Sequence, residues 1–248
     1  MSARGVAIVT GASSGIGAAV GRALGASGFA VGLGARRMDR LAAMAELVKG
    51  EGGRPVALEL DVTRAESIDA FVTAAETQLG PIDVVVSNAG VGVPGLLHEI
   101  AAEDLEMELR TNLLGPMLIA RRVLPAMLAR RSGDLVFVSS MNVVEPRPFQ
   151  VGYTAAKAGV EGLARALRRE LEGTGVRAVV VRPGPTRSEF GFAWGPQVLE
   201  RLLDSWKHWG FLRHNEMLDG EAIAEAVVWA ATQPRTTSID VIQVNPEG

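Results

Sequence analysis

Two side chains of types that are rare in this chain stand four residues apart. Tyr153 is the sole tyrosine among 248 residues, and Lys157 is one of three lysines. On a helix, positions i and i+4 share one face, so the phenol and the ammonium can converge on one point. A free phenol titrates near about 10, and a fixed cation close to it favours the phenolate and lowers that pKa. The pair predicts a general acid/base that works near neutral pH.

A hydroxyl side chain stands thirteen residues upstream of the tyrosine. Ser140 follows the apolar run 135–138, which is typical of a buried strand. A hydroxyl at that place, facing a helix that carries Tyr153 and Lys157, can hold a carbonyl oxygen. Because a Tyr-x-x-x-Lys pair also occurs by chance on surface helices, the remainder of the chain decides between catalysis and coincidence.

Composition excludes several classes of function. A net charge of −3 and a pI near 5.7 predict no nucleic-acid partner. The absence of cysteine excludes disulfides and thiol nucleophiles, and the three histidines show no metal-ligand spacing, so we expect no metal. The N-terminus leads directly into a strand rather than a signal peptide, and no apolar run reaches the roughly eighteen residues of a membrane span. We therefore expect a cytoplasmic protein without a membrane partner.

A glycine-rich turn predicts a phosphate site near the N-terminus. An apolar run at 6–9 precedes the turn at 10–17, and an alanine-rich helix is expected at 18–27. Backbone N–H groups and the helix dipole favour an anion there. No G-x-x-x-x-G-K-[ST] pattern occurs, which disfavours a nucleotide triphosphate hydrolase; a turn that merely connects stays an alternative. The expected cofactor contacts in this turn are Gly11, Ser13, Ser14, Gly15, Ile16 and Gly17.

The end of the second expected strand, 30–34, indicates which dinucleotide fits. An acidic residue about twenty positions after the glycines takes the ribose 2′-hydroxyl, whereas arginine accommodates a 2′-phosphate. That place holds Ala35, followed by Arg36 and Arg37. A guanidinium binds phosphate bidentately, so the cofactor is predicted to be NADP(H) rather than NAD. Asp39 is the rival carboxylate, although it resembles a helix cap.

Further strands are expected at 55–60, 82–87, 135–139, 176–181 and 239–244, with helices at 41–49, 65–79 and 103–130 and a helix carrying Tyr153 to about 172. This alternation predicts an α/β fold, a doubly wound parallel sheet of the Rossmann type, in a single domain over 1–248. Ligands bind at the carboxyl ends of such strands, although Asp61 can instead cap a helix, and Asn112 can face solvent or interrupt its helix. The expected cofactor contacts at these ends are Asp61, Val62, Asn88, Ala89, Gly90, Pro183, Gly184 and Thr186.

The stretch 189–217 concentrates aromatic side chains. It suits a lid over an apolar substrate, and a subunit interface is the alternative. The aromatic residues in it are Phe190, Phe192, Trp194, Trp206, Trp209 and Phe211. The candidate substrate contacts are Met141, Asn142, Gln150, Phe190 and Trp194.

In the order and spacing of these motifs, the sequence resembles the short-chain dehydrogenase/reductase family, in its NADP-preferring branch. The resemblance implies that Tyr153 is the general acid/base, that Ser140 orients the carbonyl or hydroxyl, and that Lys157 holds the nicotinamide ribose and lowers the tyrosine pKa. It also implies that Asn112 holds a water that relays protons, that Asp61 contacts adenine, and that residues 88–90 line the cofactor.

The sequence departs from the family pattern in three places. In the family, one hydroxyl after the Pro-Gly pair contacts the nicotinamide carboxamide, whereas here Thr186 and Ser188 are both candidates. Met141 and Asn142 stand where many family members have smaller residues, and the C-terminal segment lacks the ending that is common in the family. We expect an NADP(H)-dependent oxidoreductase that acts on a small, hydrophobic carbonyl or secondary alcohol, as a homodimer or homotetramer. An NAD-dependent alcohol dehydrogenase of the same family and a non-catalytic dinucleotide sensor are the alternatives.

Overall fold

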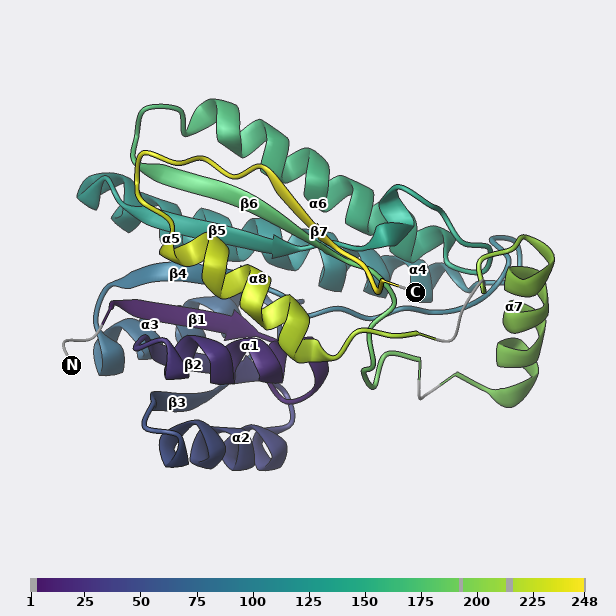
Figure 1. Cartoon of the computed structure of the whole chain (residues 1–248), viewed down its shortest axis with the longest axis horizontal. Helices are drawn as coiled ribbons and strands as arrows, with labels where there is room; N and C mark the ends of the chain where they lie inside the picture. Colours follow the sequence, from purple (N-terminus) through teal and green to yellow (C-terminus); the bar gives the residue numbers. More distant parts are fainter. Residues whose placement is uncertain (1–3, 192–193, 213–215, 248) are drawn as a thin grey trace.

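The computed structural model, described for residues 4–191, 194–212 and 216–247, alternates strands with helices along the chain. Seven strands form one parallel sheet in the order β3-β2-β1-β4-β5-β6-β7 (Figure 1). Their bounds are β1 Val6–Thr10, β2 Ala30–Ala35, β3 Arg54–Glu59, β4 Ile82–Ser87, β5 Gly133–Val138, β6 Val176–Pro183 and β7 Val241–Val244. The predicted doubly wound parallel sheet is confirmed, and the strand order reverses between β1 and β4.

Helices cover both faces of the sheet (Figure 1). One core joins the strands to α3 Ala65–Leu79, α5 Gly115–Arg130 and α6 Val151–Glu170. The other core joins them to α1 Gly15–Ala26, α2 Met38–Gly50 and α8 Gly220–Thr232. Because both faces are covered, central strands such as β1 and β5 are buried along their whole length. The sequence prediction did not include α8, which packs on α1.

The helix predicted at 103–130 is interrupted. It consists of α4 Ala102–Leu109, the π-helical turn η1 Arg110–Leu114, and α5. A π-turn inserts one extra residue into the helical ladder, a distortion that recurs at functional sites. Asn112 lies in this turn, fully buried, so the predicted single helix was wrong and the alternative of an interrupted ladder holds.

Two predicted helix caps are not formed. Helix α2 begins at Met38 with Asp39 inside its first turn, and no side chain caps it. The N-cap of α3 is Arg64 rather than Asp61. The Asp61 carboxylate instead accepts hydrogen bonds from the backbone N–H of Thr63 at 2.9 Å and from the Thr63 hydroxyl at 2.7 Å. That closed turn leaves Asp61 at the end of β3, beside the site described below.

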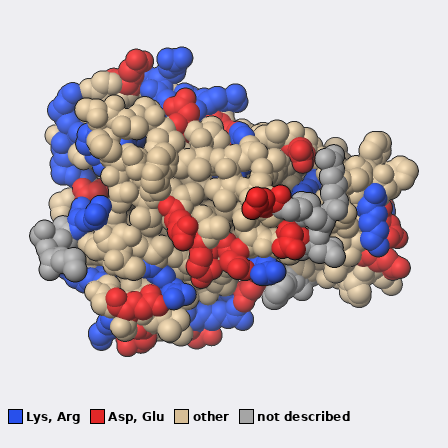
Figure 2. Space-filling view, viewed as in Figure 1, with Lys and Arg blue, Asp and Glu red and all other residues tan. Residues whose placement is uncertain are grey.

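Helix α7 Pro196–His208 stands to one side of the layers (Figure 1). It belongs to the aromatic stretch 189–217, of which Phe192 lies outside the described residues. Figure 2 shows that the surface at α7 carries both acidic and basic side chains. In the described part of the chain, no helix has the length and apolar character needed to cross a membrane.

Candidate active site

One cavity of about 1250 Å³ opens along the carboxyl ends of the strands. It contains the site predicted from the strand ends, because parallel strands bring the loops that follow them to the same edge. Gly17 and Asn112 are the predicted residues that do not line it. The predicted residues that line it are Gly11, Ser13, Ser14, Gly15, Ile16, Arg36, Arg37, Asp61, Val62, Asn88, Ala89, Gly90, Ser140, Met141, Asn142, Gln150, Tyr153, Lys157, Pro183, Gly184, Thr186, Phe190 and Trp194.

Tyr153 and Ser140 meet on the wall of this cavity. Ser140 follows β5 in extended conformation and caps a short 3-10 turn, η2 Met141–Val143, while Tyr153 lies in the first turn of α6. Although the tyrosine keeps some exposure to the cavity, burial of the phenol raises its pKa to about 12. A hydrogen bond with Ser140 lowers the pKa, and the charge of Glu108 raises it. The phenol therefore carries its proton at neutral pH.

Lys157 lies one turn after the tyrosine and is 4% exposed. Its Nζ donates a hydrogen bond to the Val138 carbonyl at 2.8 Å and lies 5.7 Å from the centroid of the Tyr153 ring. Burial lowers the lysine pKa to about 8. We expected Lys157 to lower the Tyr153 pKa, but the pKa is raised. Burial of the phenol is the largest effect, and it exceeds the lowering by the Ser140 hydrogen bond.

Asn112 ties the π-helical turn to the loop after β4. Its Nδ2 donates to the Val91 carbonyl at 2.7 Å, and its Oδ1 accepts from the Val91 N–H at 3.0 Å. Gly90 permits this approach, because a Cβ there would lie 2.9 Å from Oδ1 of Asn112 and 3.7 Å from Nζ of Lys157. Asn112 therefore positions the floor of the site from behind the cavity wall.

Glu108 is a buried carboxyl that the sequence analysis missed. One oxygen, Oε1, accepts a hydrogen bond from the Val93 N–H at 2.9 Å, whereas the other, Oε2, is buried without a partner. Burial raises its pKa above the ordinary value. Glu108 stands one helical turn before Asn112, and glycine at position 152 leaves room for its carboxyl group against α6. No spacing rule separates such a residue from a solvated helix carboxylate.

The glycine-rich turn joins β1 to α1 as predicted. Gly11 and Gly15 have φ values of 68° and 53°, which favour glycine. A Cβ on Gly17 would overlap the carbonyl oxygen of Gly11 and the side chain of Asn88, so this glycine serves packing rather than the cavity wall. The first turn of α1 carries no acidic residue and no side-chain cap, which leaves its N–H groups for an anion.

Asn88 and Thr10 join the ends of β4 and β1, where the strand order reverses. The Thr10 hydroxyl accepts from the N–H groups of Asn88 at 3.0 Å and Ala89 at 2.9 Å. Nδ2 of Asn88 donates to the Thr10 carbonyl at 3.0 Å. These bonds fix the crevice in which dinucleotides bind in folds of this type.

The two arginines after β2 differ in their partners. Arg37 donates to the hydroxyls of Ser13 and Ser14, at 3.1 and 2.8 Å, and pairs with Glu189 at 2.8 Å. Arg36 is exposed, lines the cavity, and makes no hydrogen bond or ion pair with any described residue. Arg37 therefore shapes the turn, while Arg36 is free to bind a phosphate. This donor set, with the glycine turn, fits a dinucleotide that carries a 2′-phosphate.

Aromatic side chains from the stretch after β6 face the tyrosine. The rings of Tyr153 and Phe190 lie 5.0 Å apart between centroids, and Phe190 meets Trp194 edge-on at 5.4 Å. The indole N–H of Trp194 donates to the Gly92 carbonyl at 2.8 Å. The side chains of Asn142 and Gln150 are hydrogen-bonded to each other, and both residues line the cavity wall.

The hydroxyls of Thr186 and Ser188 both line the cavity. Oγ1 of Thr186 donates to the Gly184 carbonyl at 2.9 Å, and Oγ of Ser188 accepts from the Phe190 N–H at 3.2 Å.

Arg147 also lines the cavity and was missed by sequence reasoning; only its position between two prolines sets it apart. Among the described residues, no cluster of side chains could hold a metal ion.

Comparisons with known proteins agree with this geometry. The chain is 39% identical over 188 residues to a short chain dehydrogenase of Pseudocercospora fijiensis, a match that covers 75% of this chain and 60% of that relative. The chain thus spans about three fifths of that relative's length.

Two solved structures share the fold over almost all of both chains. An alcohol dehydrogenase from Thermococcus sibiricus in complex with 5-hydroxy-NADP is 30% identical, with a TM-score of 0.83 over 96% of this chain and 95% of the other. A variant actinorhodin polyketide ketoreductase with NADPH is 28% identical, with a TM-score of 0.86 over 99% and 98%. A family model described as short chain dehydrogenase matches residues 5–197. The chain therefore belongs to the short chain dehydrogenase family.

Proposed function

We propose that the protein is an NADP(H)-dependent carbonyl reductase that acts on hydrophobic ketones or aldehydes and, in reverse, on secondary alcohols. One observation carries the proposal: Tyr153, Ser140 and Lys157 line the same cavity as the glycine-rich turn and Arg36. A pure dinucleotide sensor has no use for a phenol placed beside a hydroxyl and an ammonium. The NADP and NADPH complexes of structural neighbours support the choice of cofactor.

The residues that would hold the cofactor follow the strand ends. The turn at Gly11–Gly15 would take the pyrophosphate, Arg36 the 2′-phosphate, Asp61 the adenine side, and Lys157 the nicotinamide ribose. Pro183, Gly184 and either Thr186 or Ser188 would border the nicotinamide. When bound, NADPH supplies the hydride for the carbonyl carbon.

Tyr153 supplies the proton for the carbonyl oxygen. Its raised pKa keeps the phenol protonated at neutral pH, the state that a general acid needs for reduction. Ser140 donates to the same oxygen and orients it. After the phenol has given up its proton, Lys157 stabilises the phenolate, since its Nζ lies 5.7 Å from the ring. Asn112 would hold a water that returns the proton.

The aromatic stretch 189–217 acts as the lid of this site. Phe190 lies against the tyrosine ring and Trp194 packs edge-on against Phe190, while the indole N–H of Trp194 donates to the Gly92 carbonyl, on the loop after β4. Such a cover excludes water from the reacting carbonyl. Part of the stretch, 192–193 and 213–215, lies outside the described residues. The apolar rings in the described part favour a hydrophobic substrate.

We further propose that the enzyme works in the cytoplasm as a homodimer or homotetramer. The family resemblance supports this assembly. Light scattering coupled to size exclusion measures the mass in solution, and a monomer at micromolar concentration contradicts it.

The reaction is tested by following the loss of NADPH absorbance with the native protein against a panel of apolar ketones, aldehydes and diketones, with NADH in parallel. Turnover that prefers NADPH supports the proposal. Tight NADPH binding with no turnover of any carbonyl, and none of the corresponding alcohols with NADP⁺, contradicts it and favours a sensor.

A further inference from the structure

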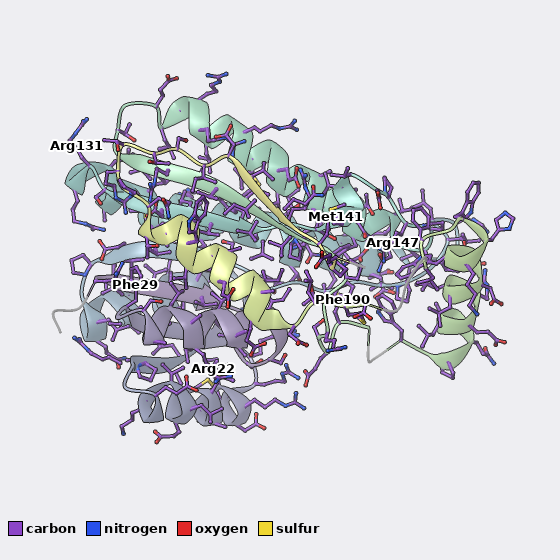
Figure 3. All side chains as sticks on the ribbon, in the orientation of Figure 1. Arg22, Phe29, Arg131, Met141, Arg147 and Phe190 are labelled. Atoms are coloured by element: carbon purple, nitrogen blue, oxygen red, sulfur yellow. The ribbon has the colours of Figure 1, made fainter. Side chains whose placement is uncertain are left out.

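A guanidinium that forms no hydrogen bond or ion pair with any described residue lines the substrate end of the cavity. Arg147 borders the same cavity as Ser140 and Tyr153, and its Nε is buried without a hydrogen-bond partner. No carboxylate of the described residues lies within 4.0 Å of it. Figure 3 shows Arg147 near Phe190, between the end of the sheet and α7. The rest of the site leaves this charge unused.

Two aromatic rings hold the guanidinium by its faces. Its central carbon lies 4.8 Å from the centroid of the Trp206 ring and 5.9 Å from that of Phe211. The loop is fixed in turn, because the indole N–H of Trp206 donates to the Pro148 carbonyl at 3.0 Å. Stacking of this kind covers the π-faces of an arginine and leaves its N–H edge available. The terminal Nη edge of the guanidinium, unlike the buried Nε, is therefore available to a planar, bidentate acceptor.

The other half-buried arginines among the described residues are paired with carboxylates. Arg177 binds Asp134 at 2.6 Å, and Arg182 binds Glu161 at 2.7 Å. A buried donor without a hydrogen-bond partner destabilises the folded state by about 1–3 kcal/mol, and a charged group by more. Burial lowers the pKa of Arg147 while the charge of Glu145 raises it, yet arginine stays protonated in proteins. A half-buried guanidinium in a ligand cavity, with its Nε buried and unpaired, indicates that the ligand supplies the partner.

The cavity also indicates what kind of anion fits. Two aromatic rings of the lid stretch, those of Trp206 and Phe211, lie against the guanidinium, so the anion belongs to an apolar molecule. Two exposed carboxylates, Glu145 and Glu216, line the same cavity. They oppose a doubly charged phosphate more than a singly charged group, and their exposure to solvent weakens their field relative to that of the half-buried arginine. A carboxylate meets these conditions.

We propose that Arg147 anchors a carboxylate of the substrate, so that the enzyme reduces an apolar or aromatic oxo acid whose carbonyl reaches Tyr153. This inference rests on the proposed reduction of a carbonyl at the same site. The carboxylate stays unchanged while the carbonyl accepts a hydride from NADPH and a proton from Tyr153, which gives the hydroxy acid and NADP⁺. Arg147 acts on specificity rather than on the reacting atoms.

Binding without turnover tests the anchor first. Isothermal titration of the protein saturated with NADP⁺, which occupies the phosphate sites, compares 2-naphthoate with 2-naphthamide. The native chain should bind the carboxylate about 10–100-fold more tightly, the range expected for charge-assisted hydrogen bonds. Arg147→Met should abolish that preference, and Arg147→Lys should keep only part of it. Arg169→Met is the control, because that side chain is 87% exposed on the far end of α6.

Turnover separates this inference from the proposed reaction. With NADPH, native enzyme should prefer 6-acetyl-2-naphthoate to its methyl ester by about tenfold or more in kcat/KM, and Arg147→Met should lose the preference through KM with the ester unaffected. Equal binding of naphthoate and naphthamide overturns the anchor, even if the ester is reduced. Tighter binding of 2-naphthyl phosphate overturns the carboxylate assignment. A naphthoate preference lost in Arg147→Met without reduction of either ketone supports the anchor and contradicts the reductase proposal.

Discussion

The two ends of the cavity are built by different means. At the cofactor end, backbone and short polar side chains satisfy one another: Thr10 and Asn88 join two strands, and Arg37 ties the glycine-rich turn to Glu189. At the substrate end, Arg147 keeps a buried Nε without a partner, and behind the cavity wall Glu108 keeps a buried Oε2 without one. These mutual hydrogen bonds keep the shape of the cofactor end fixed, and that shape suits any ligand with the same phosphate groups. At that end only exposed or backbone donors of the described residues are left unpaired, whereas the buried unpaired atoms of Arg147 and Glu108 select for one particular ligand or proton.

The largest effect on stability is expected at Gly17 of the cofactor end, where there is no room for a larger side chain. Gly17→Ala places a methyl group against the Gly11 carbonyl and the Asn88 amide, so the turn must shift. Overpacking of this kind costs about 1–3 kcal/mol of unfolding free energy, and NADPH affinity should fall with it. Gly162→Ala is the matched control, since nothing lies within 4 Å of a Cβ there. Chemical denaturation measures both; equal stability of the two variants contradicts the packing role.

The second prediction separates the two arginines of the cofactor end. Arg36→Ala should weaken NADPH binding by about 1–3 kcal/mol, the scale of a hydrogen bond to a charged group, and leave NADH binding nearly unchanged. Arg37→Ala removes contacts to Ser13, Ser14 and Glu189, so it should weaken both cofactors alike. Fluorescence titration gives the four dissociation constants, and equal losses for both cofactors in Arg36→Ala would show that Arg36 does not recognise the 2′-phosphate.

The smallest effect concerns the unpaired carboxyl. The pKa of Glu108 in the folded state is raised above its usual 4.5, so the native state retains a proton that the unfolded chain releases. The contribution of Glu108 to unfolding free energy is therefore present below pH 4.5 and is lost as pH rises through the folded pKa. Glutamine does not titrate, so Glu108→Gln keeps its stability as pH rises. The free energy of unfolding of the variant should therefore increase relative to that of the native protein above pH 4.5.

The control for this series is Glu106→Gln, on the exposed face of the same helix. Urea unfolding at several pH values measures the difference between each variant and native protein. A difference for Glu108→Gln that stays constant from pH 4.5 to 8 would mean that the carboxyl is not desolvated. The same variant should move the basic limb of the reduction rate slightly to lower pH, because the charge of Glu108 raises the pKa of Tyr153.

The cofactor end is largely predictable from sequence because local rules determine it. A run of buried residues, a glycine turn and a helix start are adjacent in the chain, and Gly11 and Gly15 take the positive φ values that such a turn requires. The strand ends place Asp61, Asn88 and Pro183 on one edge for a topological reason alone. Tyr153 and Lys157 follow from helical spacing. The prediction of the sheet and its order of elements needed no tertiary detail.

The substrate end depends on contacts between segments far apart in sequence. Arg147 meets Trp206 and Phe211 only because α7 folds against the loop after β5. Glu108 is buried because it packs against Gly152 of α6 and binds the Val93 N–H. The expected direction of the Tyr153 pKa failed for a related reason, since desolvation is a property of the packed site. Such effects have no periodic pattern in the sequence.

If Tyr153 transfers the proton in carbonyl reduction, its hydroxyl is indispensable, and Tyr153→Phe removes that hydroxyl alone. The variant keeps the ring against Phe190 but removes the hydroxyl. With a ketone that the native enzyme reduces, turnover followed by NADPH absorbance should fall by about 10²–10⁴-fold, while calorimetric NADPH binding stays within about threefold of native, well under the tenfold of 1.4 kcal/mol. A variant that binds NADPH normally and reduces the ketone at a near-native rate would contradict the account.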